Sequence, residues 1–423
     1  MQKRFFLLLS FFLFTGGLFA QTYPVFPVGE YWNFPDARTM GLAGSGSISN
    51  PTGAAISLNP AALAKNRMKI LGQFTAGTRK LEERRAYPIY SRIDDITQRG
   101  TYVVNNNWMP SFQGDIIVGL NTPYLKTIGF AVHEEINHNY LYEEEVRENI
   151  FGDSLLAFNR IEFNGVTRRY ALGAGFDIGK GVLLGFQLGI LQGGLDKDST
   201  ISFQQKGFTD VKYYSNRTLD NTPVVFTLGA IYDLNKRISL GSHLQLPYSL
   251  KYNFSDSILT GAGKETIEYP TQLTVGFEYR AQQVLEAKLN IDFTYEWWSK
   301  TNYSSDDPTS RFRNKTLDDA LAIKVGIEHI FHNKIPFQLG YQFRTSYSNR
   351  STISRSLITA GTGFRGRNWQ VEAAGGFSGL DYRFGDLFDD TMYGGDRHLS
   401  PIDDVSENFF FGLVTLKINI QKK

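Results

Sequence analysis

The chain has 423 residues, a formal net charge of +2 and no cysteine. The near-neutral charge argues against a nucleic-acid binder, which would need an excess of Lys and Arg to neutralise phosphates, and without cysteine the chain can form neither disulfides nor thiolate metal sites. The 41 glycines and the 14% aromatic content suit a membrane barrel, which carries a girdle of aromatic residues at each interface.

Residues 1–20 have the three parts of a secretory signal peptide. Lys3 and Arg4 supply a basic start, residues 5–14 an apolar core, and Ala20 a small residue before the cleavage point. The alternative is a membrane anchor, but the apolar core is shorter than the ~20 residues that a spanning helix needs. We therefore expect export and cleavage. No later segment is apolar over such a length, so any spanning structure in the mature chain must be a β-barrel.

Residues 21–66 do not alternate between polar and apolar, and small residues dominate them. Asn59, Pro60 and Ala61 indicate a helix cap followed by proline in the first turn. A flexible linker is the alternative, but linkers lack apolar residues such as Leu42 and Leu63. Because wall side chains fill only the narrowest barrels, we predict that this segment is a hatch inside the lumen and that residues 67–423 form the barrel.

Residues 285–297 show the clearest strand pattern, since apolar and polar residues alternate there without a break. An extended chain places Ile291 and Phe293 on one face, toward lipid, and Asn290 and Asp292 on the other, toward the lumen. Recurrence of this pattern predicts an all-β transmembrane barrel of about 14 antiparallel strands. The predicted strands are 67–80, 110–120, 126–138, 165–178, 181–194, 222–235, 236–252, 268–280, 284–299, 318–331, 335–348, 353–364, 367–379 and 407–420.

Short and long connections alternate between these strands. The short ones are rich in turn residues, as at Gly179–Lys180 and Asn235–Lys236, and one of them, around Ser348–Ser351, falls where a long connection is expected. Outer-membrane barrels have short periplasmic turns and long outer loops, so the long connections are predicted to lie outside the cell. They are 81–109, 139–164, 195–221, 253–267, 300–317 and 380–406.

Four short motifs resemble a known family, the FadL-like long-chain fatty acid transport proteins of the outer membrane. They are the Arg-x-x-Gly-x-x-Gly-Ser-Gly stretch at Arg38–Gly46, the pair Ala54 and Ala55, the Asn-Pro-Ala-x-Leu ending at Asn59–Leu63, and the patch Asn107–Ser111 before the second strand. The chain departs from the family where Asn50, Pro51 and Thr52 replace an acidic pair and where Ala62 replaces a common glycine. The helix-start motif also occurs in barrel components of a protein secretion system.

The resemblance implies a fourteen-stranded barrel with a hatch that blocks the lumen. Hydrophobic ligand would be captured from outside, near Asn59, Pro60 and Ala61, and would leave sideways through a gap in the wall. A fatty acid needs an apolar site for its tail and a cation for its carboxylate. The cations on the predicted lumen face are Lys288, Lys324, Arg344 and Arg280. The alternative is that they pair with carboxylates on neighbouring strands, namely Glu278, Glu286, Asp292, Glu296 and Glu328.

The sequence contains no complete motif for an enzyme or a cofactor site. The G-x-G-x-x-G match at Gly361–Gly366 precedes a strand rather than a helix, and the His133–His138 run is one residue too long for a zincin. No G-x-S-x-G nucleophile motif is present. The acidic groups in predicted outer loops favour solvated loops, with a calcium site as the alternative. These groups are Glu143, Glu144 and Glu145, and Asp386, Asp389, Asp390 and Asp396.

The sequence therefore predicts an exported outer-membrane barrel, without catalysis or cofactor, in a Gram-negative type of envelope. Its partners would be the lipid bilayer and a long-chain fatty acid or another hydrophobic small molecule, which would pass inward by diffusion through a hatch-gated lumen. Two alternatives stay open. One is a barrel subunit of a secretion or surface-attachment system, and the other, less favoured for lack of a nucleophile, is an outer-membrane lipid hydrolase.

Overall fold

The structure is a computed structural model, and it describes residues 28–31, 34–90, 96–148, 154–257, 262–281, 286–307, 316–347, 354–393 and 402–421. The predicted signal peptide, residues 1–20, and the connection around Ser348–Ser351 lie outside these ranges. Within them, no helix is long and apolar enough to cross a membrane.

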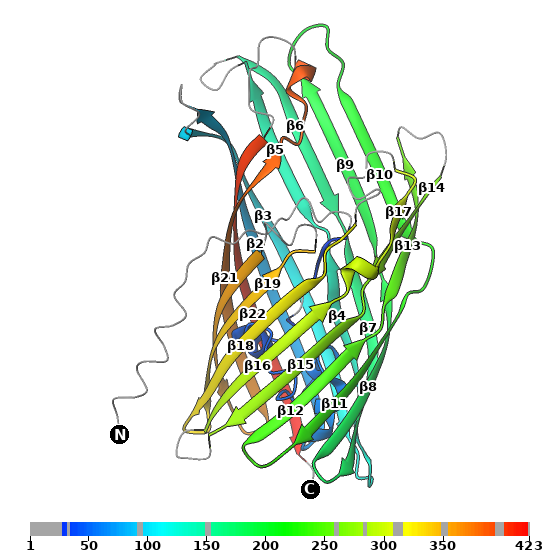
Figure 1. The fold of residues 1–423 in the computed structure, drawn as a ribbon, viewed down its shortest axis with the longest axis vertical. Coiled ribbons are helices and arrows are strands. Elements are labelled where there is room, and N and C mark those ends of the chain that lie inside the picture. Colours follow the sequence, from blue (N-terminus) through cyan, green and yellow to red (C-terminus); the bar gives the residue numbers. More distant parts are fainter. Residues whose placement is uncertain are drawn as a thin grey trace.

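The main sheet closes on itself as a barrel of 14 antiparallel strands, which confirms the predicted fold class (Figure 1). Each strand pairs with its neighbour around the wall, and the ring is completed by pairing between its two end strands, β7 and β4. In spatial order the strands are β4 (Leu125–Asn137), β3 (Ile96–Gly119), β2 (Met68–Tyr90), β22 (Ile402–Gln421), β21 (Trp369–Gly385), β20 (Ser354–Arg365), β19 (Ile335–Thr345), β18 (Ala320–Phe331), β16 (Glu286–Glu296), β15 (Gln272–Arg280), β12 (Ile238–Gln245), β11 (Val224–Asp233), β8 (Val182–Gln192) and β7 (Val166–Gly179).

The register of β16 is the one that its alternation predicts. Asn290 is fully buried and Asp292 is 1% exposed on the lumen side, whereas the side chain of Phe293 is 48% exposed on the outer face. Ile291 shares the outer face with Phe293. The barrel therefore presents an apolar band to lipid and a polar face to its interior, as a transmembrane barrel requires.

Most of the predicted long loops are in fact strands, and this corrects the sequence prediction. Strands β2 and β3 take up 81–90 and 96–109, and β21 and β22 take up 380–385 and 402–406. The other long connections build a second, seven-stranded sheet at one end of the barrel (Figure 1). Its strands are β17 (Tyr303–Ser305), β14 (Gly263–Tyr269), β13 (Tyr248–Asp256), β10 (Val211–Leu219), β9 (Gly194–Phe203), β6 (Leu155–Asn164) and β5 (Tyr140–Arg147).

These extensions escaped prediction because polar residues occupy both of their faces. In β2, Glu83 and Arg85 are fully buried inside while Glu82 and Arg84 face outward. In β5, the middle residue of the predicted acidic loop, Glu144, is buried and accepts a hydrogen bond from Asn159 at 2.9 Å. Outside the membrane, neither face of a strand contacts lipid, so neither face has to be apolar. The alternation of apolar and polar residues, on which the strand prediction depends, is therefore absent there.

A line of strand breaks, which we call the seam, separates the barrel from the second sheet. The predicted strand 236–252 is interrupted at Leu246–Pro247, β14 and β15 are separated by Pro270–Thr271, and β4 ends before His138–Asn139. After β16 the chain makes the short 3₁₀ helix η4 (Trp298–Lys300) before β17. Proline lacks the N–H that a sheet ladder needs, which explains two of these breaks.

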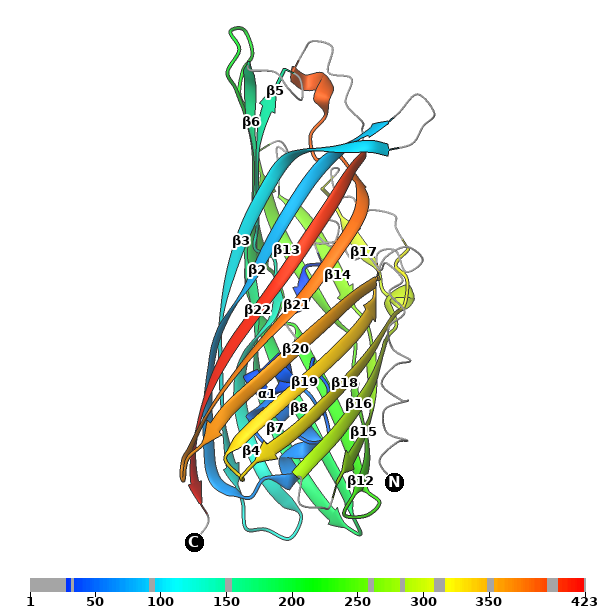
Figure 2. The same cartoon turned by 90° about the vertical axis from the view of Figure 1, so that its left-hand side faces the viewer.

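The N-terminal segment 34–66 lies inside the barrel, at the end that carries the short turns (Figure 2). It contains α1 (Ala37–Gly41) and two 3₁₀ helices, η2 (Gly53–Ile56) and η3 (Pro60–Lys65). The predicted cap at Asn59 is present, since its side-chain oxygen accepts a hydrogen bond from the backbone N–H of Ala61 at 3.1 Å, with Pro60 in the first turn. A further 3₁₀ helix, η5 (Asp390–Tyr393), follows β21.

Buried ion pairs attach this segment to the wall. Arg38 donates to both oxygens of Glu328, at 2.7 and 2.8 Å, and Lys417 lies 3.2 Å from Asp36. Burial alone would raise the pKa of the Asp36 carboxyl, but Lys417 and hydrogen bonds from Thr39 hold it below its usual value. Removing one partner of such a pair would leave a buried charge uncompensated, at a cost of about 3–5 kcal/mol.

The wall facing this segment is built from glycines, which let the two backbones approach closely. A Cβ atom added at any of them would lie 3.2 Å or less from an atom of the N-terminal segment. They are Gly129, Gly173, Gly175, Gly185, Gly229, Gly241, Gly276, Gly326, Gly340 and Gly361. The segment is therefore fitted to nine strands of the wall rather than suspended in the lumen.

Candidate functional site

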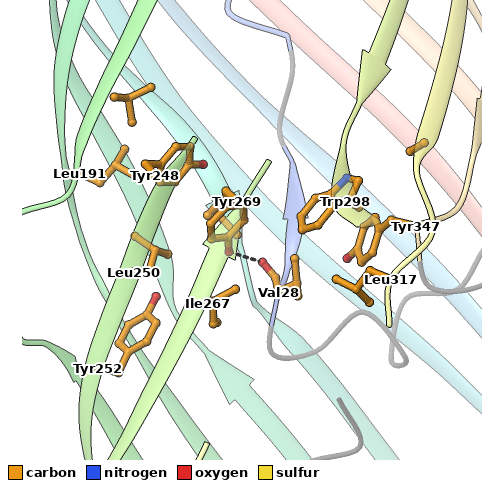
Figure 3. Close-up of a cluster of buried hydrophobic side chains, with 13 residues drawn as sticks. Val28, Leu191, Tyr248, Leu250, Tyr252, Ile267, Tyr269, Trp298, Leu317 and Tyr347 are labelled. Atoms are coloured by element: carbon orange, nitrogen blue, oxygen red, sulfur yellow. Dashed lines mark hydrogen bonds between the residues drawn. The ribbon is translucent and has the colours of Figure 1, made fainter. Parts of the chain in front are cut away.

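A group of aromatic side chains fills the lumen at the level of the seam, above the N-terminal segment (Figure 3). Tyr248 and Tyr269 stack with ring centroids 4.8 Å apart, and Trp298 stacks on Tyr347 at 4.3 Å. With Tyr252 these rings form what we call the aromatic cluster. Aliphatic side chains complete its lining, and they are Val28, Ile136, Leu191, Val225, Leu250, Ile267, Leu317 and Ala320.

The chain fills this cluster with its own N-terminal residues. Val28 is 1% exposed and lies between Tyr269 and Trp298, and its carbonyl oxygen accepts a hydrogen bond from the Tyr269 hydroxyl at 2.7 Å (Figure 3). The strand that follows, β1 (Glu30–Tyr31), pairs with β4 at Asn137 and Ile136. An apolar group with one acceptor oxygen therefore occupies the centre of the cluster.

A small polar chamber of about 60 Å³ lies between the aromatic cluster and the N-terminal segment. Two hydrogen bonds mark the boundary with the cluster, from the Tyr248 hydroxyl to Glu135 at 3.4 Å and from the Trp298 indole N–H to Glu296 at 2.7 Å. The chamber is lined by Pro35, Gly44, Ser47, Ser57, Leu58, His133, Glu135, Arg169, His243, Gln245, Gln272, Thr274, Asp292 and Lys324.

Of the predicted lumen cations, only Lys324 lines this chamber. Lys288 lies 3.6 Å from Glu328, Arg344 donates to both oxygens of Glu296 at 2.8 and 3.0 Å, and Arg280 donates to Glu278 at 2.6 Å. These three have the carboxylate partners that the alternative interpretation expects. In the described part of the chain, no carboxylate lies within ion-pair distance of the Lys324 ammonium.

Asn59, Pro60 and Ala61 lie elsewhere, in the packing between η3 and the wall. A Cβ at Gly185 would collide with the backbone of Pro60 and Ala61, and the Asn59 side chain donates to the carbonyl of Ser242 at 3.2 Å. None of the three lines the aromatic cluster or the polar chamber. Their place in the structure is that of attachment points for the N-terminal segment.

Sequence reasoning missed the aromatic cluster altogether. Tyr248, Tyr252 and Tyr269 lie within the predicted barrel strands 236–252 and 268–280, but in the structure they belong to β13 and β14 of the second sheet. The signal that could have located them is the pair Pro247 and Pro270, since two prolines beside inward-facing tyrosines mark a common break in neighbouring strands.

The backbone ladder of the barrel wall is interrupted on one side at this level, between β3 and β4, and we call this interruption the gap. Their ladder covers only the pairs from Gly114–Val132 to Gly119–Thr127. Beyond it, β4 turns inward, residues 133–138 are all buried, and β1 rather than β3 pairs with its free edge. Further out, the wall is restored by the Asn107 side chain, which bonds to the backbone N–H and carbonyl of Leu141 at 2.6 and 2.9 Å.

His138 lies at the end of this inward turn, directly beneath β1. Burial, with a smaller contribution from Arg217, lowers its pKa to about 4, so its ring is neutral at physiological pH. An ideal Cβ on Gly29 would lie 2.7 Å from the His138 ring and 2.5 Å from Ile136. The gap is thus closed from inside by an uncharged, tightly fitted contact with the N-terminal strand.

The described residues contain no group of three or more Asp, Glu or His side chains placed to hold a metal ion. The predicted alternative of a calcium site in the last outer loop also involves Asp396, which lies outside those residues.

The fold of this chain, a closed antiparallel barrel of 14 strands, matches that of solved barrels of the FadL type. No family model and no curated protein matches the sequence itself. A FadL homologue from Pseudomonas aeruginosa has the same fold, with a TM-score of 0.64 and 15% identity over 93% of this chain and 100% of that chain. The toluene transporter TodX of P. putida matches with a TM-score of 0.64 and 13% identity, over 92% and 100% of the two chains. CymD, a monoaromatic hydrocarbon channel, matches with a TM-score of 0.59 and 12% identity, over 92% and 98%.

Proposed function

We propose that this protein is an outer-membrane channel of a Gram-negative type of envelope, exported with a cleaved signal peptide, that takes up hydrophobic compounds by passive diffusion. The observation that carries the proposal is the aromatic cluster, with Val28 in the place of a ligand. An enclosed site lined by aromatic and aliphatic side chains binds an apolar solute by removing its surface from water. The solved barrels of this fold include a toluene transporter and a monoaromatic hydrocarbon channel.

The polar chamber beside the cluster favours an amphiphile with a small anionic head, such as a long-chain fatty acid. A carboxylate removed from water needs a cation or several hydrogen-bond donors. Lys324 lines the chamber and has no carboxylate within ion-pair distance in the described residues. We infer that the tail occupies the aromatic cluster in place of Val28 and that the head meets Lys324.

The gap between β3 and β4 supports a lateral route out of the site. The N-terminal segment is packed against wall glycines and held by Arg38–Glu328, so a path straight through it would require breaking many contacts. The gap requires only that β1 leave the edge of β4, at Asn137 and Ile136. A ligand that displaces Val28 from the cluster therefore also frees the strand that closes this gap.

Replacing Lys324 with Gln tests the proposed head-group contact. We expect about 10- to 100-fold weaker binding of a long-chain fatty acid, because a hydrogen bond to a charged group contributes about 1.5–3 kcal/mol, and unchanged binding of the corresponding long-chain alcohol. Displacement of a fluorescent fatty acid from the purified protein measures both. Lys288→Gln is the matched control, since Lys288 already faces Glu328. Equal effects on acid and alcohol would refute the head-group assignment.

Replacing Gly29 with Val tests whether the N-terminal strand competes with ligand. Gly29 has a φ of +81° and no room for a side chain beside Ile136 and His138, so valine should detach β1 from β4. The apparent affinity for hydrophobic ligands should then rise. The factor is the inverse of the fraction of unaltered molecules in which β1 has already left the site. Gly207→Val, at a φ of +93° with no atom within 4 Å of the added Cβ, controls for backbone strain. Unchanged affinity at position 29 would show that β1 does not limit access.

A barrel subunit of a secretion or surface-attachment system is the alternative function. It predicts stable copurification with a large envelope complex and no saturable binding of hydrophobic ligands. Detergent extraction followed by size-exclusion chromatography and the same displacement assay separates the two functions.

A further inference from the structure

We propose a second, outward-facing site on the barrel wall, which holds an anionic lipid of the outer leaflet. The proposal depends on the chain spanning a membrane but not on its taking up any solute. Its basis is a hollow of about 520 Å³ on the seam, a volume in the range of ligand pockets. The lining residues are Pro247, Tyr248, Ser249, Glu268, Tyr269, Pro270, Thr271, Trp297, Lys300 and Thr301.

The hollow opens away from the lumen. Ser249 and Glu268 are cross-strand partners on β13 and β14, and the residues beside them in each strand, Leu250 and Ile267, belong to the aromatic cluster inside. Successive side chains of a strand point to opposite faces, so Ser249 and Glu268 point outward. Pro247 and Lys300 on the rim are exposed as well.

The hollow lies just beyond the apolar band of the barrel. Leu246, immediately before it, is 39% exposed, and Val275 on the next strand is 49% exposed. Tyr295 and Trp297 form an edge-to-face pair with centroids 5.0 Å apart at the same end of β16. Aromatic residues of this kind mark the membrane–water interface of a barrel. A site directly beyond these two residues therefore lies at the level of the lipid head groups and borders the acyl chains of the membrane.

The chemistry of the hollow fits an acyl chain with an anionic head. Two prolines, Trp297 and the two tyrosines make its lining mainly apolar. Glu268 is already engaged, since it accepts hydrogen bonds from the N–H and side chain of Asn302 at 2.9 and 3.2 Å. Lys300 on the rim and Lys251 on the outward face of β13 are exposed, and neither makes an ion pair within the described ranges.

The lipid would also close a weak place in the wall. Tyr248 and Tyr269 line the hollow on its inner side and are at the same time two rings of the aromatic cluster. A single layer of side chains therefore separates the two sites, at a level where Pro247 and Pro270 remove ladder hydrogen bonds. An acyl chain seated in the hollow would exclude water from that layer.

Native mass spectrometry of the detergent-purified protein, titrated with lipid A and separately with phosphatidylethanolamine, tests the proposal. We expect the protein to retain lipid A in preference to phosphatidylethanolamine, which has no net charge. The Lys300→Gln variant should retain lipid A about fivefold more weakly, because one lysine near a membrane surface contributes about 1 kcal/mol. Lys334→Gln, in the β18–β19 turn at the opposite end of the barrel, should bind as the unaltered protein does. Equal retention by the two variants, or no preference for the anionic lipid, would overturn the head-group contact.

Quenching by lipids with brominated acyl chains tests the acyl part independently. Trp297 lines the hollow, so a brominated acyl chain bound there should quench its fluorescence. Part of the quenching of tryptophan fluorescence should therefore be lost when Trp297 is replaced by Phe. Heat-modifiable migration on a gel checks that both proteins are folded. Identical quenching of the two would place the chain elsewhere and overturn the site. Fatty acid binding in the Lys300→Gln variant should be unchanged, and this separates a failure of this proposal from a failure of the uptake function.

Discussion

Replacing Gly185 with Leu should open the lumen without unfolding the barrel. Gly185 lies on β8 where the backbone of Pro60 and Ala61 passes, and an added side chain would occupy the space of that backbone. Overpacking of this kind costs about 1–3 kcal/mol, and the segment carrying η3 can yield while the interstrand ladders of β8 stay paired. We expect new sensitivity of cells to large antibiotics, with unchanged heat-modifiable migration of the protein on a gel.

Gly412→Leu is the matched control for this experiment. Gly412 lies in β22, and a Cβ added there meets no atom within 4 Å. Cells with this variant should keep the permeability of the original strain. If the Gly185 variant, shown to be folded and inserted, also left permeability and uptake unchanged, the fitted N-terminal segment would not be a barrier, and the secretion alternative would gain weight.

Replacing Ile291 with Arg should destabilise the barrel by roughly 2–4 kcal/mol, because the side chain lies on the lipid face near the middle of β16, where a charge meets hydrocarbon. Urea titration of the protein refolded into lipid vesicles measures the change in the free energy of unfolding.

Ile335→Arg is the control for depth. Ile335 is 43% exposed on the outer face, at the start of β19 beside the short turn after β18, and an arginine near the interface costs only about 0–1 kcal/mol. Similar losses at the two positions would contradict the assigned depth of β16 in the membrane. Asn290, next to Ile291, would be a poor control, since it is fully buried and packs against Gly46 of the N-terminal segment.

The number and register of the barrel strands could be predicted because lipid imposes a strict contrast between the two faces of a strand. The apolar Ile291 lies on the lipid face and the polar Asn290 in the lumen, as their chemistry requires. Lys288 pairs with Glu328 because the two residues carry opposite charges at paired positions of neighbouring strands. The strand ends could not be predicted in the same way. In the second sheet Glu143 faces outward and Glu144 inward with the same chemistry, so no pattern distinguishes a strand from a solvated loop.

The aromatic cluster as a whole could not be predicted, because Pro247 and Pro270 locate only its tyrosines and no local pattern connects these with the other members. Val28, Tyr248, Tyr269, Trp298 and Tyr347 come from segments far apart in the sequence, and the closure of the barrel brings them together. A resemblance of the N-terminal motifs directed attention to Asn59, Pro60 and Ala61 instead. In the structure, those residues attach the N-terminal segment to the wall.

The pairing of β2 with β22 has a consequence for how the molecule is made. These are the first and last strands of the barrel in the sequence, so the ring is complete only after the whole chain has been delivered to the membrane. The N-terminal segment precedes β2 in the sequence and is fitted closely to the glycines of the wall. We therefore expect the cylinder to close around a segment already in place, so a variant that delays the docking of Ala61 or Arg38 should accumulate as an open, protease-sensitive sheet during assembly.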